Sequence, residues 1–312
     1  MTSPRGKVSL APLVFFSVIA LLGAAAPTGA TPKVGYPVIA AAGDIACDPF
    51  EGSYDGGRGT ASACRQLATS NLLLRGSYTA VLTLGDNQYE DGAYAKYLFS
   101  YARSWGRVKR ITRPAPGNHE YETRGASGYV RYFGRAAGPP GRGYYSFDLG
   151  GWHFVSLNSN CSEIGGCQEG SPEERWLRRD LAAHRTTCTL AYWHHPRFSS
   201  GPHGNDESVS GLWHALYDYG ADVVLSGHDH DYERFAPQNV AGALDRAQGI
   251  REFVVGTGGK SHYGIGSLQP HSQVHDSTSF GIVALTLKPR SYDWRFVPAV
   301  GSFTDRGSAR CH

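Results

Sequence analysis

The stretch Gly227-His228-Asp229-His230-Asp231-Tyr232-Glu233-Arg234 follows an apolar run, Ala221 to Leu225, that is typical of a buried strand. In an extended segment, two side chains that are separated by one residue point to the same face. His228 and His230 therefore face together, while Asp229 faces elsewhere. Imidazole is the commonest metal ligand in proteins. The stretch therefore predicts a metal-binding edge at the end of a strand, where the two histidines can serve two neighbouring ions.

Four other apolar runs also end in polar groups. They are Val38 to Ala42 before Gly43-Asp44, Ala80 to Leu84 before Gly85-Asp86-Asn87-Gln88-Tyr89, Ile111 to Pro116 before Gly117-Asn118-His119-Glu120, and Thr189 to Trp193 before His194-His195-Pro196. Ligands of an open α/β sheet bind beyond the carboxyl ends of its strands. A single Gly-Asp pair is usually a simple turn. Five such strand ends together indicate one shared crevice.

The order GD, GD, GNHE, H, GHxH resembles the calcineurin-like metallophosphoesterases, over most of the chain that follows the first thirty residues. Within that family, the GHDHDYER ending and a Tyr three residues after Asp86 are similar to the purple acid phosphatase branch. Many family members have Asp-x-His at the first motif, whereas this chain has Asp44-Ile45-Ala46. The purple acid phosphatase branch also lacks that His and uses a Tyr as a ligand.

The resemblance implies two metal ions that share Asp86. One ion would be held by Asp44, Asp86, Tyr89 and His230, and the other by Asp86, Asn118, His194 and His228. Carboxylate, amide oxygen and imidazole suit zinc, manganese and iron, and a phenolate favours ferric iron, so we expect iron with zinc or manganese. Tyr89 has an alternative role in packing, because most of the 18 tyrosines of the chain simply pack.

Two further histidines are predicted to act on the substrate. His119 lies next to Asn118 and is expected to stabilise the phosphoryl group or to protonate the leaving oxygen. His203 follows His194 in a polar loop, at a spacing that resembles a substrate-binding His of purple acid phosphatases. His195 is interpreted as the packed or solvated neighbour of a ligand.

Residues of other segments are predicted to support this site. Glu120 and Glu233 are interpreted as carboxylates that orient neighbours such as Arg234, or that lie on the surface. Side chains of glycine-containing loops are expected to shape the leaving-group pocket, namely Tyr144, Tyr145, His262 and Tyr263.

Residues 1–30 have the pattern of a secretory signal peptide, with Arg5 and Lys7, an apolar stretch from Leu10 to Leu22, and small residues up to Ala30. The apolar stretch is short for a membrane span, so we expect a secreted protein with no stable membrane association after cleavage. Removal of this segment lowers the formal net charge from +3 to about +1. Because no run of Lys or Arg exceeds two residues, we do not expect a nucleic-acid partner. We expect a small phosphorylated substrate instead.

All six cysteines follow the signal segment, and an even number in an exported chain suggests disulfides. Proximity in the sequence favours Cys47 with Cys64 and Cys161 with Cys167, which leaves Cys188 with Cys311. Fifteen pairings are possible, and six buried or free thiols are the alternative.

The expected fold is a four-layer α/β/β/α sandwich, in which helices flank two mixed sheets. Residues 31–312 are expected to form a single catalytic domain. Helices are predicted over residues 61–74, 94–105, 172–184 and 207–219, and later strands over 152–157, 252–255, 281–287 and 292–297.

The sequence thus predicts an exported phosphatase with two metal ions, which hydrolyses phosphate monoesters by attack of an activated water. A phosphodiesterase that acts on nucleotides or lipid headgroups is the first alternative, because the same pair of ions can cleave either ester. A secreted binding protein without catalysis is the second alternative, and the complete set of ligand residues argues against it.

Overall fold

The computed structural model describes residues 1–7, 9–13 and 35–312. Most of the apolar stretch of the predicted signal peptide lies outside these residues. The segment Met1–Gly35 and the segment Tyr36–His312 are separate units. The described residues of the first unit contain no helix or strand, and all elements below belong to the second.

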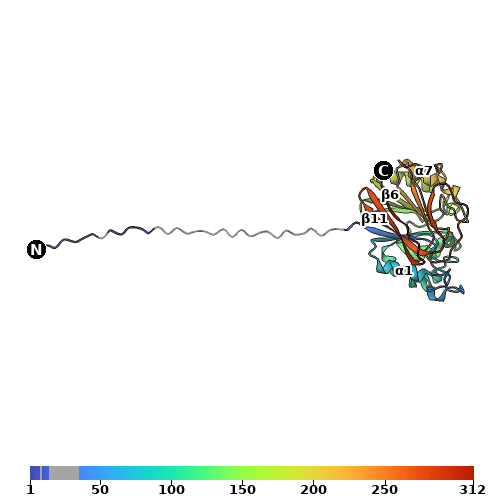
Figure 1. Cartoon of the computed structure of the whole chain (residues 1–312), viewed down its shortest axis with the longest axis horizontal. Helices are drawn as coiled ribbons and strands as arrows, with labels where there is room; N and C mark the ends of the chain where they lie inside the picture. The colour runs from blue at the N-terminus through green and yellow to red at the C-terminus, as the bar shows by residue number, and fades with distance from the viewer. Residues whose placement is uncertain (8, 14–34) are drawn as a thin grey trace. The chain divides into compact units, whose positions relative to one another are not determined.

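The first sheet combines three parallel strands with an antiparallel half (Figure 1). Its strands are β1 (Val38–Ala42), β2 (Ala80–Leu84), β3 (Thr112–Ala115), β11 (Phe280–Lys288), β12 (Ser291–Val300) and β13 (Arg306–Arg310), in the order β13-β12-β11-β1-β2-β3. Strands β1, β2 and β3 run parallel, and β11 pairs antiparallel with β1. The ends of β1, β2 and β3 therefore open on the same edge.

The second sheet has a parallel centre and antiparallel strands at its two sides. Its strands are β4 (Tyr145–Leu149), β5 (Trp152–Ser156), β6 (Cys188–Tyr192), β7 (Val223–Ser226), β8 (Tyr232–Phe235), β9 (Arg251–Val255) and β10 (Ser272–Asp276), in the order β10-β8-β9-β7-β6-β5-β4. Strands β5, β6, β7 and β9 are parallel. Both sheets are mixed, as the sequence predicts.

The α-helices of the described residues are short. The α-helices are α1 (Gln66–Arg75), α2 (Tyr94–Phe99), α3 (Asn118–Tyr121), α4 (Ser127–Phe133), α5 (Cys161–Ile164), α6 (Pro172–Ala183) and α7 (Ser210–Asp218). The 3-10 turns are η1 (Asp55–Gly57), η2 (Tyr101–Arg103), η3 (Trp105–Ile111), η4 (Arg124–Ala126), η5 (Gly134–Ala137) and η6 (Glu207–Val209). None of the helices in the described residues has both the length and the apolar character needed to cross a bilayer.

The alternation of side chains along the strands creates two cores. Leu190 and Tyr192 of β6 pack between the sheets, whereas Ala191 belongs to a second core that includes Leu177 of α6 and Leu212 of α7. On the other side, α1 packs on β11 and β12. The predicted four-layer α/β/β/α sandwich is confirmed.

Three predicted helices are shorter in the structure, and the one predicted over 207–219 is the 3-10 turn Glu207–Val209 followed by the α-helix Ser210–Asp218. The helix predicted from residue 61 begins at Gln66, because the Cys64 backbone is held away from helical geometry at φ +61° and its N–H bonds to the Lys260 carbonyl. The helix predicted over 94–105 ends at Phe99 and continues as 3-10 turns. The helix at Pro172 has the predicted cap, since the Ser171 side chain accepts a hydrogen bond from the Glu174 backbone N–H.

All six cysteines are paired in three disulfides, Cys47–Cys64, Cys161–Cys167 and Cys188–Cys311. These are the pairs that proximity in the sequence favours. The third disulfide joins the start of β6 to the chain that follows β13, and so links the two sheets.

His153 of β5 is a buried ionic link between neighbouring elements. Its Nδ1 lies 2.8 Å from Asp148 Oδ1 of β4, and its Nε2 lies 2.9 Å from Asp180 Oδ2 of α6. Carboxylate oxygens only accept, so both nitrogens must carry hydrogen. Burial by itself lowers the pKa of His153, but the hydrogen bonds to Asp180 and Asp148 raise it above its ordinary value overall.

We predict that stability depends on pH through His153. Because its folded pKa is raised, its contribution is complete below about pH 6.5, the pKa of an unfolded histidine, and is lost as the pH rises through the folded pKa. Urea unfolding between pH 5 and 9 should therefore show a smaller pH slope for His153→Gln than for the wild type. The matched control is His214→Gln on the exposed face of α7, which should keep the wild-type slope. Equal slopes for His153→Gln and the wild type would refute the ionic link.

Candidate metal centre

The predicted ligand residues all follow strands at one edge of the molecule. Asp44, Asp86 and Asn118 come after β1, β2 and β3 of the first sheet. His194 follows β6 and His228 follows β7 of the second sheet. Loops that start on two different sheets thus meet in one cluster, although the residues span most of the sequence.

Tyr89 is the centre of the first half of the cluster. Its hydroxyl oxygen lies 2.9 Å from Asp44 Oδ1, 2.9 Å from Asp86 Oδ2 and 3.0 Å from His230 Nε2. His230 Nε2 is also 3.3 Å from Asp44 Oδ1. Burial, followed by the carboxylates of Asp44 and Asp86, raises the pKa of Tyr89 well above its ordinary value, so the phenol of the metal-free chain keeps its proton.

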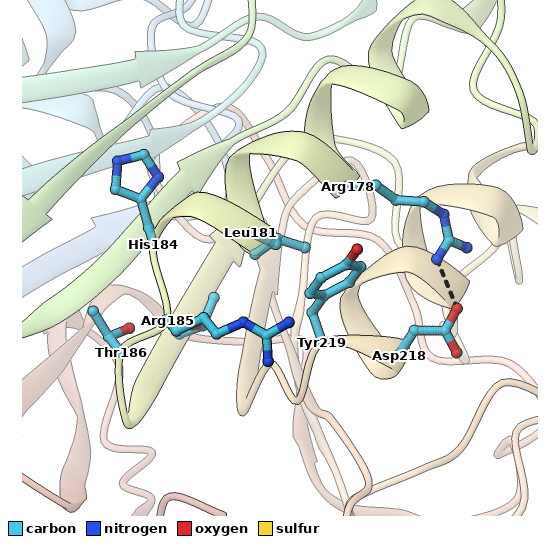
Figure 2. Close-up of a pocket in the computed structure, with 8 residues that line it drawn as sticks. Arg178, Leu181, His184, Arg185, Thr186, Asp218 and Tyr219 are labelled. Carbon is cyan, nitrogen blue, oxygen red and sulfur yellow. Dashed lines mark hydrogen bonds and ion pairs between the residues drawn. The ribbon is translucent and has the colours of Figure 1, made fainter.

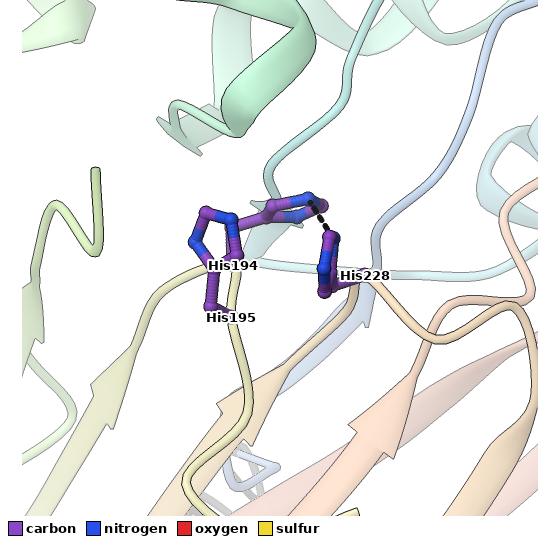
Figure 3. A group of neighbouring side chains, drawn as sticks. All are labelled: His194, His195 and His228. Carbon is purple, nitrogen blue, oxygen red and sulfur yellow. Dashed lines mark hydrogen bonds between the residues drawn. The ribbon is translucent and has the colours of Figure 1, made fainter. Parts of the chain in front are cut away.

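His194 is the centre of the second half. Its Nε2 lies 3.0 Å from Asn118 Oδ1, 3.2 Å from Asp86 Oδ2 and 3.2 Å from His228 Nδ1. Figure 3 shows the contact between the His194 and His228 rings as a dashed line. Asp86 Oδ2 contacts both halves, which is the position that a bridging ligand requires.

The hydrogen bonds of His194 test whether the cluster suits cations. Its Nδ1 lies 2.9 Å from the Leu84 carbonyl oxygen, which only accepts, so Nδ1 carries a hydrogen. In the neutral ring the lone pair of Nε2 then faces the oxygens of Asn118 and Asp86, which a cation can satisfy. A second proton on Nε2 would satisfy the same oxygens. Burial lowers the pKa of His194, but the adjacent Asp86 reverses this and raises it to about 9.

The backbone around the cluster is strained and crowded. Asp44, Asp86 and His228 have φ values of 59°, 45° and 71°, a region that residues other than glycine rarely adopt. A Cβ added at Gly85, which has φ +83°, would lie 2.4 Å from His194 Nδ1, and one at Gly117 would lie 2.2 Å from Asp86 Oδ1. The glycines of the GD and GNHE motifs therefore give the side chains room to converge.

Glu120 is fully buried and joins two of the loops. Its carboxylate accepts hydrogen bonds from the N–H groups of Asn87, Gln88 and Gly117, and from the Tyr97 hydroxyl. Burial, and then Asp86, raise the pKa of Glu120 to about 7, while these donors oppose the rise. Glu120 is thus an internal support rather than a surface carboxylate.

The two histidines that are predicted to act on the substrate, His119 and His203, lie beside the candidate ligands. His119 Nε2 lies 3.9 Å from Asp86 Oδ2, and the His119 ring is 4.3 Å from that of Tyr89. The His203 ring is 4.0 Å from that of His228. Both predicted residues therefore lie beside the candidate ligands without replacing them.

The other predicted supporting residues divide into two groups. The Tyr263 ring stacks on the His230 ring at 3.9 Å, so Tyr263 borders the candidate centre. Tyr144 packs on Trp176, Tyr145 bonds to Tyr192, and His262 packs on Phe280. Glu233 accepts hydrogen bonds from Ser200, and Arg234 pairs with Asp305, so the expectation that Glu233 orients Arg234 is wrong.

Lys260 is a neighbour of the centre that the sequence does not predict, whereas His195 is the neighbour of a ligand that the sequence predicts. The Lys260 ammonium lies 4.8 Å from the centre of the Tyr89 ring and pairs with Glu51 and Glu90. The His195 ring is 4.4 Å from the His228 ring. Burial lowers the pKa of His195 to about 3, and the adjacent His194 adds to the effect.

A cavity of about 470 Å³ lies between α6 and α7, and residues such as Arg178, Arg185 and Asp218 line it (Figure 2). It includes Thr189 near the start of β6, whereas His194 follows the end of that strand. None of the predicted site residues lines this cavity. The predicted site residues therefore lie at the strand-end cluster and not in this cavity.

Comparisons with known proteins match this architecture. The model of the calcineurin-like phosphoesterase family matches residues 38–232. Purple acid phosphatase 15 of Arabidopsis thaliana is 33% identical over 149 residues, which cover 42% of this chain and 27% of the relative. The chain thus spans only about a quarter of that relative.

Two solved structures share the fold. Purple acid phosphatase PPD1 from yellow lupin (Lupinus luteus) superposes with a TM-score of 0.66 at 18% identity, over 88% of this chain and 53% of that one. GAP50, described as the anchor in the inner membrane complex of Plasmodium, superposes with a TM-score of 0.63 at 14% identity, over 89% and 90%. At these identities the two likenesses demonstrate the fold alone.

We predict that Glu120→Gln weakens both the fold and the centre. The Gln amide group must turn one N–H toward a buried backbone donor, which costs about 1–3 kcal/mol of unfolding free energy. Urea unfolding and titration with a competing chelator should show lower stability and weaker metal binding. Glu122→Gln, two residues away and exposed, is the matched control. Wild-type metal affinity in Glu120→Gln would contradict the supporting role.

Proposed function

The chain belongs to the calcineurin-like phosphoesterase family, in its purple acid phosphatase-like branch, and from this we propose that it is an exported phosphatase that hydrolyses phosphate monoesters with two metal ions. The observation that carries the proposal is the convergence of seven metal-binding side chains, with Asp86 in contact with both halves of the cluster. A site of this composition suits hydrolysis of a phosphate ester.

The two halves of the cluster provide one set of ligands for each ion. The first ion would be held by Asp44, Asp86, Tyr89 and His230, and the second by Asp86, Asn118, His194 and His228. The first site combines a phenol with carboxylates, which suits iron. The second site combines an amide oxygen with imidazoles, which suits zinc or manganese. When bound, such a pair of ions polarises phosphoryl oxygens and makes a water nucleophilic at neutral pH.

His119 is suited to move a proton. Its Nδ1 faces the backbone carbonyl of Glu90, which only accepts, so Nδ1 keeps a hydrogen. The other nitrogen, Nε2, lies 3.9 Å from Asp86 Oδ2 and faces the candidate ligands. A proton at Nε2 can stabilise a phosphoryl oxygen or pass to the leaving oxygen. We further propose that His203, whose Nδ1 lies 2.7 Å from Asp229 Oδ1 and whose ring is 4.0 Å from the His228 ring, contacts the same substrate.

Export is supported by the signal-peptide pattern of residues 1–30 and by the three disulfides, which persist in oxidising compartments. The proposed substrate is a small phosphorylated molecule. A nucleic acid is not proposed, since the near-neutral charge after signal removal provides no basic surface for a polyanion.

A binding protein without catalysis is a second candidate, because GAP50, whose fold is similar, is described as an anchor. The fold by itself does not require catalysis. The complete set of seven metal-binding side chains favours the enzyme, since a binding protein has no need to maintain it.

We predict that the pure protein turns over a phosphomonoester with a higher kcat/KM than a phosphodiester. His119→Ala should lower kcat by about 10²- to 10⁴-fold, the range for a general acid, with the metal content unchanged. A preference for the diester would make the protein a phosphodiesterase. Bound metal without turnover of either ester would favour the binding protein, and loss of metal in His119→Ala would make His119 structural.

We also predict a broad visible absorption band for the iron-loaded protein, because a phenolate that ligates ferric iron absorbs visible light. Tyr89→Phe should abolish the band and leave the fold intact, since the ring is retained. Elemental analysis should accompany the spectra. A band that survives in Tyr89→Phe, or iron-loaded wild-type protein without a band, would remove Tyr89 from the ligand set.

A further inference from the structure

His195, beside the candidate ligand His194, is held by a single buried serine. The ring Nδ1 of His195 lies 2.7 Å from Ser159 Oγ, and the backbone N–H of His195 donates to the same oxygen at 3.0 Å. Ser159 is 3% exposed. The side chain and the backbone of His195 are thus fixed by one hydroxyl group.

This pair of hydrogen bonds determines which ring nitrogen carries the hydrogen. Ser159 Oγ accepts from the His195 backbone, so its own hydrogen needs an acceptor. Among the contacts of Ser159 Oγ in the described structure, His195 Nδ1 is the only group that can accept it. Nδ1 therefore accepts, and the hydrogen of the imidazole is on Nε2.

The His195 ring borders the cluster of candidate ligands. It lies 4.9 Å from the His194 ring and 4.4 Å from the His228 ring, and the three imidazoles stand together in Figure 3. One nitrogen from each of the three lies within 4.8 Å of the others. A ring nitrogen that already carries a hydrogen cannot bind a metal ion, but it can donate a hydrogen bond.

The hydrogen-bond partners of His119 Nδ1 and His203 Nδ1 differ from the partner of His195 Nδ1, because they can only accept. His119 Nδ1 faces the Glu90 carbonyl, and His203 Nδ1 lies 2.7 Å from Asp229 Oδ1. Both partners only accept, so in the neutral rings of His119 and His203 the hydrogen is on Nδ1 and Nε2 is an acceptor. His195 differs because its Nε2 donates without a second proton.

We propose that His195 is a substrate-binding residue whose Nε2–H donates a hydrogen bond to a phosphoryl oxygen, with Ser159 fixing the tautomer that makes this possible. The proposal rests on the proposed function and adds a role to it. In this role His195 adds a hydrogen-bond donor for the negatively charged phosphoryl group beside His119 and His203. In this role Ser159 is a positioning residue.

The test combines kinetics, phosphate binding and metal analysis. His195→Ala should weaken binding of inorganic phosphate and lower kcat/KM by about 10- to 150-fold, which corresponds to one hydrogen bond to a charged group, with two metal ions retained. His195→Gln, whose amide N–H2 can reach the place of Nε2, should recover most of the loss. Ser159→Ala should cause a smaller loss of about 2- to 10-fold. His214→Ala, on the exposed face of α7, is the matched control and should behave as the wild type.

Three results would overturn the proposal. Loss of a metal ion in His195→Ala would make His195 a ligand or a support of one. Wild-type phosphate affinity in His195→Ala would make it a spectator, and failure of His195→Gln to recover function would exclude a simple donor. If the wild type binds metal and phosphate but cleaves no ester, the proposed function fails, while the phosphate affinities still decide the role of His195.

Discussion

The site depends on one electrostatic constraint, which is that carboxylates, a phenol and imidazoles are buried within about hydrogen-bonding distance of one another. Five of the seven candidate ligands are 2% exposed or less, and Asp86 is in contact with both halves. Buried charges are costly unless they are paired or bind metals. Two cations would satisfy the Asp86 carboxylate and the lone pair of His194 together.

The surrounding structure holds this crowded arrangement in place. Glycines at the strand ends leave room for neighbouring side chains, and the strained φ values of Asp44, Asp86 and His228 aim these residues inward. Glu120 binds the loops after β2 and β3 to each other. The two cores beneath make the strands rigid, so that loops from two sheets keep their relative positions.

The location of most candidate ligands could be predicted from the sequence. An apolar run that ends in Gly-Asp or Gly-Asn indicates the end of a strand, as at Asp86 and Asn118. The convergence of the strand ends could be predicted, but the individual side-chain contacts between their loops could not. Ser159 meets His195 only because β5 and β6 pair with Ser156 opposite Tyr192, which places both residues three positions beyond the paired ends. Lys260 reaches Tyr89 from a loop that follows β9, a contact that depends on the packing of the two sheets. The role of Glu120 was likewise hidden, since its partners are backbone N–H groups of another loop.

The most direct test of the account is the number of metal ions bound per chain in the wild type and in Asp86→Asn, measured on folded protein of equal purity. Because Asp86 contacts both halves, the account predicts two ions in the wild type and weakened binding of both in Asp86→Asn, with Asp44→Asn losing only the ion of the Tyr89 half. A wild type that binds no metal, or an Asp86→Asn variant that keeps two ions with unchanged affinity, would contradict it.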